Sequence, residues 1–301
     1  MTTTNTIKIK FFSDFCDSQT CKEKFEYSCN VHELPFYGFD KEVYFTTNDD
    51  YTHAIILNKA MPPELKQKNI PKENVIGLAC EPFDFLRITP EFVEYAKKHI
   101  GKYLIGDKRN LPEPFIGHFG YMWFDRPAAE IQQKNKVMSI VLSDKKFAPG
   151  HNYRHSLVNQ IIANKLPIDI YGRGSNAYKN AYPNHVKGEF TKSEPYEDYL
   201  YTVAIENFTS DHYVSEKILT PVMYNCMPVY IGAKYIQNYV SDVILLSGNC
   251  DNDIKLLIAI LENPGKYYKR TYTEKNLKTI NLLGVGEPRF PYNPSSGKEK
   301  Y

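Results

Sequence analysis

The sequence contains no long hydrophobic run. Its first residues, MTTTNTIKIKFF, show neither a positively charged segment followed by an apolar one nor a cleavage site, so no signal peptide is predicted. No stretch approaches the roughly 18 consecutive apolar residues that a transmembrane helix needs. We therefore expect a chain with no integral membrane segment.

The sequence also has no excess of charge of one sign. Thirty-seven basic residues and 35 acidic residues leave a net charge of +2, which gives no electrostatic reason to expect nucleic acid as a partner. A hydrophobic content of 42% is ordinary for a globular protein. Because 301 residues exceed the usual size of one hydrophobic core, we expect two domains.

Cysteine is sparse, with six residues scattered along the chain. This usage indicates reduced thiols and a cytoplasmic protein. An alternative to free thiols is zinc binding by Cys16, Cys21 and Cys29, but the spacings of these cysteines match no usual zinc module. No Asp-x-Asp motif lies at a predicted strand end, and the DND at 251–253 is interpreted as a helix cap, so we predict no metal site.

Alternating and apolar segments predict an α/β protein with two domains and a tail. The irregular, Pro-, Gly- and aromatic-rich segment 111–127 and a polar helical stretch up to Lys136 mark the boundary. The predicted parts are an N-terminal domain (1–130), a C-terminal domain (131–283) and an extended tail (284–301).

Within these domains, short segments are assigned as strands or helices from the periodicity of their apolar residues and from the prolines and glycines that interrupt them. We expect strands at 7–12, 43–46, 53–58, 75–80, 103–105, 137–142, 168–171, 200–205, 229–232 and 243–246. We expect helices at 89–99, 154–164, 233–239, 251–262 and 265–282, and polar loops at 13–30 and 143–153.

Glu81 is the first candidate functional residue. It follows the buried strand VIGLAC directly and precedes Pro82. A partly desolvated carboxylate in that place has a raised pKa and serves as a general base. The alternative is a surface glutamate that caps a turn, and the sequence leaves both interpretations open.

Two further patterns carry alternatives. YGRGSNA at 171–177 satisfies the loose dinucleotide pattern, but Pro183 and the polar residues around it leave little room for the helix which that pattern requires. His118 and the single tryptophan, Trp123, lie in the boundary segment. An aromatic face there either stacks on a sugar or packs the linker, and packing is favoured.

The most informative stretch is 204–232, AIENFTSDHYVSEKILTPVMYNCMPVYIG. It predicts a strand, a polar turn, a helix that begins near Ser215 and a second strand. A helix N-terminus offers free N–H groups and partial positive charge, and Lys217 adds a full charge, so a diphosphate fits there. Glu216 accepts hydrogen bonds from vicinal hydroxyls such as those of a ribose. A solvated helix cap is the alternative.

This stretch resembles the donor-binding signature of the α1,3-fucosyltransferases, glycosyltransferase family 10. EN at 206–207, YVSEK at 213–217 and CMPVYIG at 226–232 correspond to the family pattern ENS, DY-[VI]-T-EK and G-VPV-x-G. KVMSIVLSDK, DIYGRG and ACEP match more weakly, in the correct order. The clear resemblance covers about 137–250, and the N-terminal third is matched only around Glu81.

The resemblance implies a GT-B architecture, with two Rossmann-like domains that face each other across a cleft. It implies inverting transfer of L-fucose from GDP-fucose to a glycan hydroxyl, in the α1,3 linkage of the family, with no cofactor. Asn207, Tyr213, Glu216 and Lys217 would hold the nucleotide and its phosphates, and Glu81 would be the base. Neither the basic tail of some bacterial members nor the membrane anchor of animal members is found.

The sequence departs from the family in three places. Phe208 replaces a small polar residue, and Ser215 replaces threonine. The pyrophosphate-binding arginine has three candidates, Arg173, Lys179 and Arg154. Two other functions stay open. The same fold could transfer a sugar from another nucleotide-sugar donor, or the protein could bind glycans as a scaffold without catalysis.

Overall fold

The computed structural model describes residues 6–29, 42–127, 133–273 and 275–277. They form two compact units. The N-terminal unit contains the described residues up to Trp123 together with the segment 211–213, and the C-terminal unit contains 124–210 and the described residues from Val214 onward. The predicted boundary at 130/131 and the predicted tail at 284–301 lie outside the described residues.

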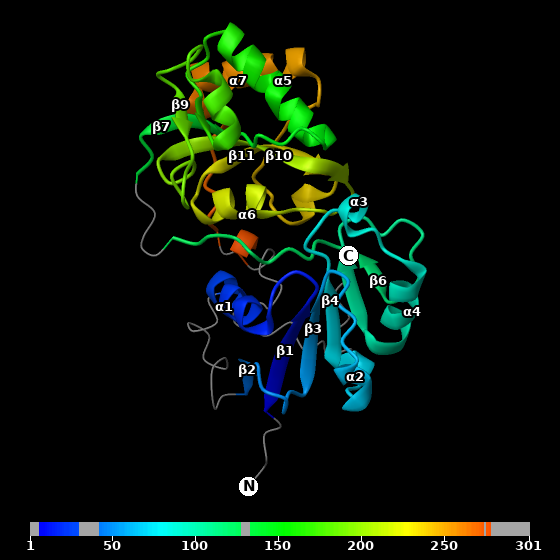
Figure 1. Cartoon of the computed structure of the whole chain (residues 1–301). Coiled ribbons are helices and arrows are strands. Elements are labelled where there is room, and N and C mark those ends of the chain that lie inside the picture. Colours follow the sequence, from blue (N-terminus) through cyan, green and yellow to red (C-terminus); the bar gives the residue numbers. More distant parts are fainter. Residues whose placement is uncertain (1–5, 30–41, 128–132, 274, 278–301) are drawn as a thin grey trace. The chain divides into compact units, whose positions relative to one another are not determined.

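The N-terminal unit is a parallel sheet with the strand order β2-β1-β3-β4-β5-β6 (Figure 1). Its strands are β1 (Ile7–Ser13), β2 (Val43–Phe45), β3 (His53–Leu57), β4 (Val75–Leu78), β5 (Lys102–Ile105) and β6 (Phe115–Gly117). Its helices are α1 (Ser18–Cys29), α2 (Glu64–Gln67), the 3₁₀ turn η2 (Lys72–Asn74), α3 (Phe83–Leu86) and α4 (Pro90–His99).

Both faces of this sheet are covered, as the apolar run of β3 predicts. All five residues of β3 are buried. Ile55 packs in one hydrophobic cluster with Phe25 of α1, whereas Ile56 packs in a second cluster with Phe92 of α4. Since successive side chains of a strand point to opposite faces, α1 and α4 cover opposite sides of the sheet.

The C-terminal unit is a second parallel sheet, with the order β12-β11-β10-β7-β8-β9. Its strands are β7 (Lys136–Val141), β8 (Asp169–Tyr171), β9 (Val186–Gly188), β10 (Tyr199–Ser210), β11 (Met227–Ala233) and β12 (Ile244–Leu245). Its helices are α5 (Pro149–Ala163), η3 (Arg173–Tyr178), α6 (Glu216–Met223), η4 (Ile236–Asn238), α7 (Cys250–Glu262) and α8 (Pro264–Tyr267).

The main core of this unit lies between the sheet and the pair α5 and α7. Ile140, Val203 and Val229 from adjacent strands pack with Leu157 of α5 and Leu257 of α7, all of them buried. In Figure 1, α6 lies on the other side of the sheet from α5 and α7. The sheet is therefore buried on both faces, which explains why its strands read as nearly continuous apolar runs.

Several predicted loops and helices are wrong. The loop predicted at 13–30 contains α1, whose only fully buried apolar side chains among those described are Cys21 and Phe25, so its periodicity is weak. The loop predicted at 143–153 ends early, because Pro149 starts α5 with a fixed φ suited to the first helical position. The helix predicted at 265–282 is helical only over α8 and 275–277 among the described residues.

Other predictions are confirmed. Thr89 caps α4 by accepting the backbone N–H of Phe92 at 3.2 Å, as its sequence predicts. The α/β fold with parallel sheets is also found. Within the part of the chain that the structure describes, none of the helices has the length and apolar character needed to cross a membrane.

Candidate functional site

In the N-terminal unit, polar residues gather where three adjacent strands end. Asp14 follows β1, Asn58 follows β3 and Glu81 comes shortly after β4. The chain continues from β1 to β2 on one side, whereas β3 to β6 follow one another on the other side. The reversal of strand order lies between β1 and β3, and ligands of parallel sheets bind at such a point.

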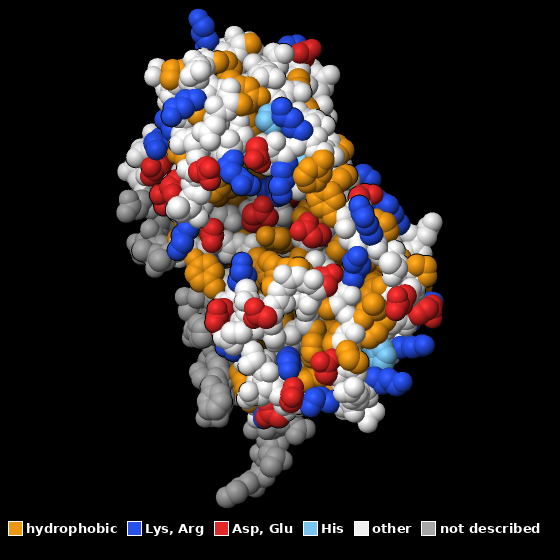
Figure 2. Space-filling view, in the orientation of Figure 1, with side chains coloured by type: hydrophobic (Ala, Val, Ile, Leu, Met, Phe, Trp, Pro, Cys, Tyr) orange, Lys and Arg blue, Asp and Glu red, His pale blue; other side chains and the backbone are white. Residues whose placement is uncertain are grey.

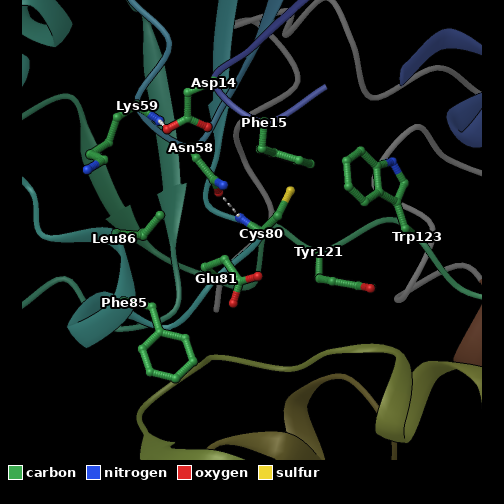
Figure 3. A pocket seen from close by; sticks show the side chains of 10 residues that line it. All are labelled: Asp14, Phe15, Asn58, Lys59, Cys80, Glu81, Phe85, Leu86, Tyr121 and Trp123. Carbon is green, nitrogen blue, oxygen red and sulfur yellow. Dashed lines mark hydrogen bonds between the residues drawn. The ribbon is translucent and has the colours of Figure 1, made fainter. Parts of the chain in front are cut away.

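A pocket of about 340 Å³ lies at this edge of the sheet (Figure 3). It contains a carboxylate, Glu81, whose side chain Figure 3 shows between Phe85 and Tyr121. Its lining residues are Asp14, Phe15, Asn58, Lys59, Cys80, Glu81, Phe85, Leu86, Tyr121 and Trp123. The pocket combines two acids at strand ends, Asp14 and Glu81, with several aromatic rings, which is the composition of a site for a small polar ligand with apolar faces.

Asn58 fixes the turn that carries Glu81. Its backbone has a φ of 51°, in the left-handed region that asparagine tolerates better than most residues. Its side-chain Oδ1 accepts the backbone N–H of Cys80 at 2.9 Å, and its own N–H donates to the carbonyl of Leu78 at 3.0 Å. The hydroxyl of Tyr103 donates to the Asn58 carbonyl at 2.6 Å. Asn58 therefore links the ends of β3, β4 and β5.

Glu81 itself is exposed. The desolvation that we expected from the sequence is therefore not present around this carboxylate, because burial of the segment stops at Cys80 and resumes at Pro82. Pro82 holds the backbone extended before α3 begins at Phe83. The turn presents the carboxylate to the pocket without enclosing it.

The rings on the other side of the pocket form a small aromatic group. Phe15 and Trp123 meet edge to face, with ring centroids 4.9 Å apart, and Phe25 lies 6.3 Å from Trp123. The ammonium of Lys24 lies 5.3 Å from the Trp123 ring. Trp123 thus lines a pocket instead of only packing a linker. The other candidate of the boundary segment, His118, has its Nδ1 2.8 Å from the carbonyl oxygen of Phe119.

In the C-terminal unit, the corresponding place is the end of β10. Glu206 is part of this long strand and not of a turn, so the strand predicted to end at Ile205 is too short. Its carboxylate is buried, and it accepts the backbone N–H of Ser215 at 2.9 Å. The Ser215 hydroxyl lies 2.8 and 3.0 Å from the two carboxylate oxygens. Burial raises the pKa of Glu206, and Lys217 opposes this effect.

Lys217 stands in the first turn of α6, which Ser215 caps as predicted. Its Nζ donates to the Ser215 hydroxyl at 3.1 Å and to Glu216 at 2.8 Å, and it lies 3.8 Å from Glu206. Burial lowers the pKa of Lys217, but Glu216 and Glu206 together raise it by more. The lysine therefore keeps its positive charge beside a helix N-terminus.

Arg154 adds a second cation from α5. It is only 4% exposed, and one terminal nitrogen donates to Asn207 at 2.6 Å. Its buried Nε has no hydrogen-bond partner. Burial lowers the pKa of Arg154, while Glu206 and Glu216 oppose the shift. A buried guanidinium with an unsatisfied N–H is suited to an anionic ligand.

The close approach of α5 to β10 makes this geometry possible. Gly150 lies in the first turn of α5, and a Cβ added there would lie 1.8 Å from the carbonyl oxygen of Glu206. Only glycine allows the two backbones to meet in this way. The contact falls between β10 and β7, where the order of this sheet reverses.

Three further residues predicted to bind the donor are Arg173, Lys179 and Tyr213. Arg173 and Lys179 are exposed, and Arg173 lies 3.9 Å from Asp144. Tyr213 is buried, but its segment belongs to the N-terminal unit, since a Cβ on Gly106 would lie 2.4 Å from the Tyr213 Cβ. Of the three pyrophosphate candidates, Arg154 alone contacts another predicted donor residue among the contacts that the structure describes.

Metal-ligand groups are not found among the described residues, where no three His, Cys, Asp or Glu side chains gather to hold an ion. Asp253 has a structural role instead. It is buried and accepts the Ser247 N–H at 2.7 Å and the Gly248 N–H at 3.0 Å. The side chain of Asn249, and not the DND, caps α7. On the face that Figure 2 shows, acidic and basic side chains are interspersed.

Sequence reasoning missed Asn58 and the role of Glu206. The signal for Glu206 is the EN pair at the end of an apolar strand, where a charged residue must find partners. No local signal identifies Asn58, because its partner Cys80 lies 22 residues away.

The comparisons with known proteins agree with this architecture. Residues 131–245 match the family model described as glycosyltransferase family 10 (fucosyltransferase), C-terminal domain. A crystal structure of an α1,3-fucosyltransferase has a TM-score of 0.52 at 12% identity, over 96% of this chain and 86% of that chain. Such a structure with GDP has a TM-score of 0.53 at 12% identity, over 91% and 83%. No curated protein matches the sequence.

At this identity the structural likeness establishes the fold, and the family model matches residues 131–245. The GT-B class predicted from the resemblance is confirmed. Arg154, Glu206 and Lys217 all lie within the matched residues. Residues 131–245 are therefore similar to the C-terminal fucosyltransferase domain of glycosyltransferase family 10, and the protein is a glycosyltransferase.

Proposed function

We propose that the protein transfers L-fucose from GDP-fucose to a hydroxyl of a glycan acceptor, in an α1,3 linkage and with inversion at the anomeric carbon. The observation that carries the proposal is the pair of cations, Arg154 and Lys217, at the reversal point of the sheet inside the family 10 domain. Solved structures with a similar fold are of an α1,3-fucosyltransferase with GDP and with GDP-fucose.

The donor diphosphate is proposed to bind to these cations and to the N-terminus of α6. Arg154 offers an unpaired N–H, and Lys217 keeps a full charge. As the bond from the sugar to the diphosphate breaks, negative charge develops on the leaving oxygen, and preorganised cations stabilise it. Glu216 is the proposed ribose ligand, and Asn207 is held by Arg154 close to the same end of β10.

Glu81 is proposed to accept the proton of the acceptor hydroxyl, which then attacks the anomeric carbon. It is one of two carboxylates that line the pocket of the N-terminal unit, and the other, Asp14, accepts the backbone N–H of Lys59 at 3.3 Å. A sugar that stacks on such rings would exclude water from Glu81, and this would raise the pKa of the carboxylate toward that of an effective base. The base and the donor ligands lie on different units, and the proposal requires both.

Ligand-induced thermal shifts test the donor. We expect GDP to raise the Tm, and UDP, CMP and NAD to leave it unchanged at the same concentration. Stabilisation by UDP and not GDP would favour a different nucleotide-sugar donor. No stabilisation by any nucleotide would favour a glycan-binding scaffold without catalysis.

Transfer of labelled fucose to an array of glycans tests the base. Glu81→Gln keeps the shape of the side chain but cannot take a proton, so we expect transfer to fall by about 10²- to 10⁴-fold. The GDP-induced shift in Tm should be unchanged. Glu73→Gln, which alters another exposed glutamate of the same unit, is the matched control. Transfer by Glu81→Gln at the normal rate would show that the base lies elsewhere.

A further inference from the structure

Two thiols lie in contact beside the pocket of the N-terminal unit. Cys16 belongs to the turn after β1, and Cys21 belongs to the first turn of α1. Their Sγ atoms are 2.7 Å apart. The sulfur atoms of a disulfide lie about 2.05 Å apart, so less than about 1 Å of movement would join them. Neither cysteine has a role in the transfer reaction proposed above.

The turn between them is already fixed in a geometry that favours this bond. The Ser13 hydroxyl accepts the backbone N–H groups of Phe15 at 3.2 Å and of Cys16 at 3.3 Å. At the other end, Asp17 accepts the backbone N–H of Thr20 at 2.8 Å, at the start of α1. Both cysteines are thus held by short-range hydrogen bonds on either side, and bond formation requires no refolding of the segment.

The two thiols differ in exposure. Cys16 is partly exposed, whereas Cys21 is completely buried. Burial and the neighbouring Cys16 raise the pKa of Cys21. An external oxidant therefore reaches Cys16 first, and Cys21 lies behind it, in place to complete the reaction.

The same turn forms one wall of the pocket. Asp14 and Phe15, which precede Cys16 directly, both line it. Phe15 is 46% exposed and packs edge to face against Trp123. A bond between residues 16 and 21 would close a short loop that begins directly after Phe15, and it would restrict the backbone next to this ring.

We propose that Cys16 and Cys21 are a redox-active pair that forms a reversible disulfide and fixes the Phe15 wall of the pocket. The oxidant is a small disulfide such as oxidised glutathione. The Cys16 thiolate attacks one of its sulfur atoms and releases one glutathione thiolate, which takes up the proton. Cys21 then loses its proton and attacks the Cys16 sulfur, which expels the second glutathione. Two protein thiols are oxidised, and one disulfide is reduced to two thiols.

Peptide mapping of the full-length protein tests the bond. The reduced protein is incubated in mixtures of reduced and oxidised glutathione, trapped with N-ethylmaleimide and digested with trypsin. Residues 11–22, between Lys10 and the bond after Lys22, contain Cys16 and Cys21 and no other cysteine. We expect this peptide to lose two hydrogens and to resist alkylation, and to recover both thiols with dithiothreitol.

Tryptophan fluorescence tests the effect on the pocket, because Trp123 is the only tryptophan and it packs on Phe15. We expect oxidation to change the Trp123 emission in the wild type and not in Cys16→Ser. Cys21→Ser should retain one glutathione on Cys16, because no thiol remains to displace it. Cys250→Ser, which alters a partly exposed cysteine of the other unit, should behave as the wild type.

Three results would overturn the proposal. One is full alkylation of both cysteines at every glutathione ratio. Another is a cross-link from peptide 11–22 to peptide 73–87, which contains Cys80, instead of a bond within 11–22. The third is an unchanged Trp123 emission after the bond has formed. None of these readouts depends on the donor or on transfer, so the outcome is independent of the proposed function.

Discussion

Glu81 and Glu206 both lie toward the carboxyl ends of parallel strands, and they have opposite surroundings. Glu81 comes shortly after β4, which lies one strand away from the reversal of strand order, and Glu206 lies within β10, which borders the reversal in its own sheet. Glu206 is buried and bound by Ser215, with Lys217 nearby, whereas Glu81 is exposed in a pocket. The first carboxylate organises a cation site, and the second is presented to a ligand. The place in the fold therefore does not decide the role, and the partners do.

Removal of the buried carboxylate should have the largest effect on stability. Glu206→Ala leaves the Ser215 N–H without its acceptor and removes one counter-charge of Lys217. We expect a loss of about 3 kcal/mol in the free energy of unfolding, as for other broken buried pairs. Urea denaturation of this variant and of Glu81→Ala, expected within about 0.5 kcal/mol of the wild type, checks the comparison. Equal effects of the two changes would contradict it.

The second-largest expected effect is weaker GDP binding after the charge of Lys217 is removed. Lys217→Ala removes a charge-assisted hydrogen bond to the proposed diphosphate, worth about 1.5–3 kcal/mol, or roughly 10- to 100-fold in Kd. Isothermal titration with GDP measures the change. Lys165→Ala is the control, since this exposed lysine of the same unit is not among the predicted donor residues, and its Kd should stay at the wild-type value. An unchanged Kd for Lys217→Ala would show that the lysine only caps α6.

Asn58 supports the turn before Glu81 through its backbone conformation and through its side-chain hydrogen bond, and substitutions at Asn58 can separate the two contributions. Asn58→Ala loses the bond to the Cys80 N–H and places alanine at a φ of 51°, so we expect destabilisation by about 2 kcal/mol. Asn58→Gly restores the backbone conformation but not the acceptor, and Asn58→Asp restores both. Transfer rates should follow the order Asp, Gly, Ala, with unchanged GDP affinity. Identical rates for the three variants would contradict a positioning role.

The smallest expected effect is a difference between the wild type and Glu206→Gln in how the free energy of unfolding depends on pH. Because burial raises the pKa of Glu206 above its ordinary value of 4.5, the folded state favours the protonated form. Its contribution to stability is complete below 4.5 and is lost as the pH rises through the folded-state pKa. Glu206→Gln cannot titrate, so its free energy of unfolding should fall less than that of the wild type as the pH rises above 4.5. Parallel curves would show that the pKa is not shifted.

Parts of the site could be predicted from the sequence because their signals are local. Ser215 caps α6 through a nearby backbone N–H, and Lys217 follows in the same turn. The spacing therefore predicts a helix start that suits an anion, with a solvated helix cap as the alternative. Glu81 is likewise marked by a buried strand and a proline. The residues on which the acceptor depends have no such pattern. The acceptor, the linkage and the cellular location therefore stay predictions.

The sequence by itself determined two α/β units, most of their strands and the identity of the C-terminal domain. These follow from apolar runs, breakers and a motif, all of which act over a few residues. Only the tertiary structure decided that Arg154 pairs with Asn207, that Asn58 holds the turn before Glu81, and that Cys16 lies against Cys21 beside the pocket. Strand order brings the first two pairs together from 53 and 22 residues apart, and packing of α1 on β1 fixes the third.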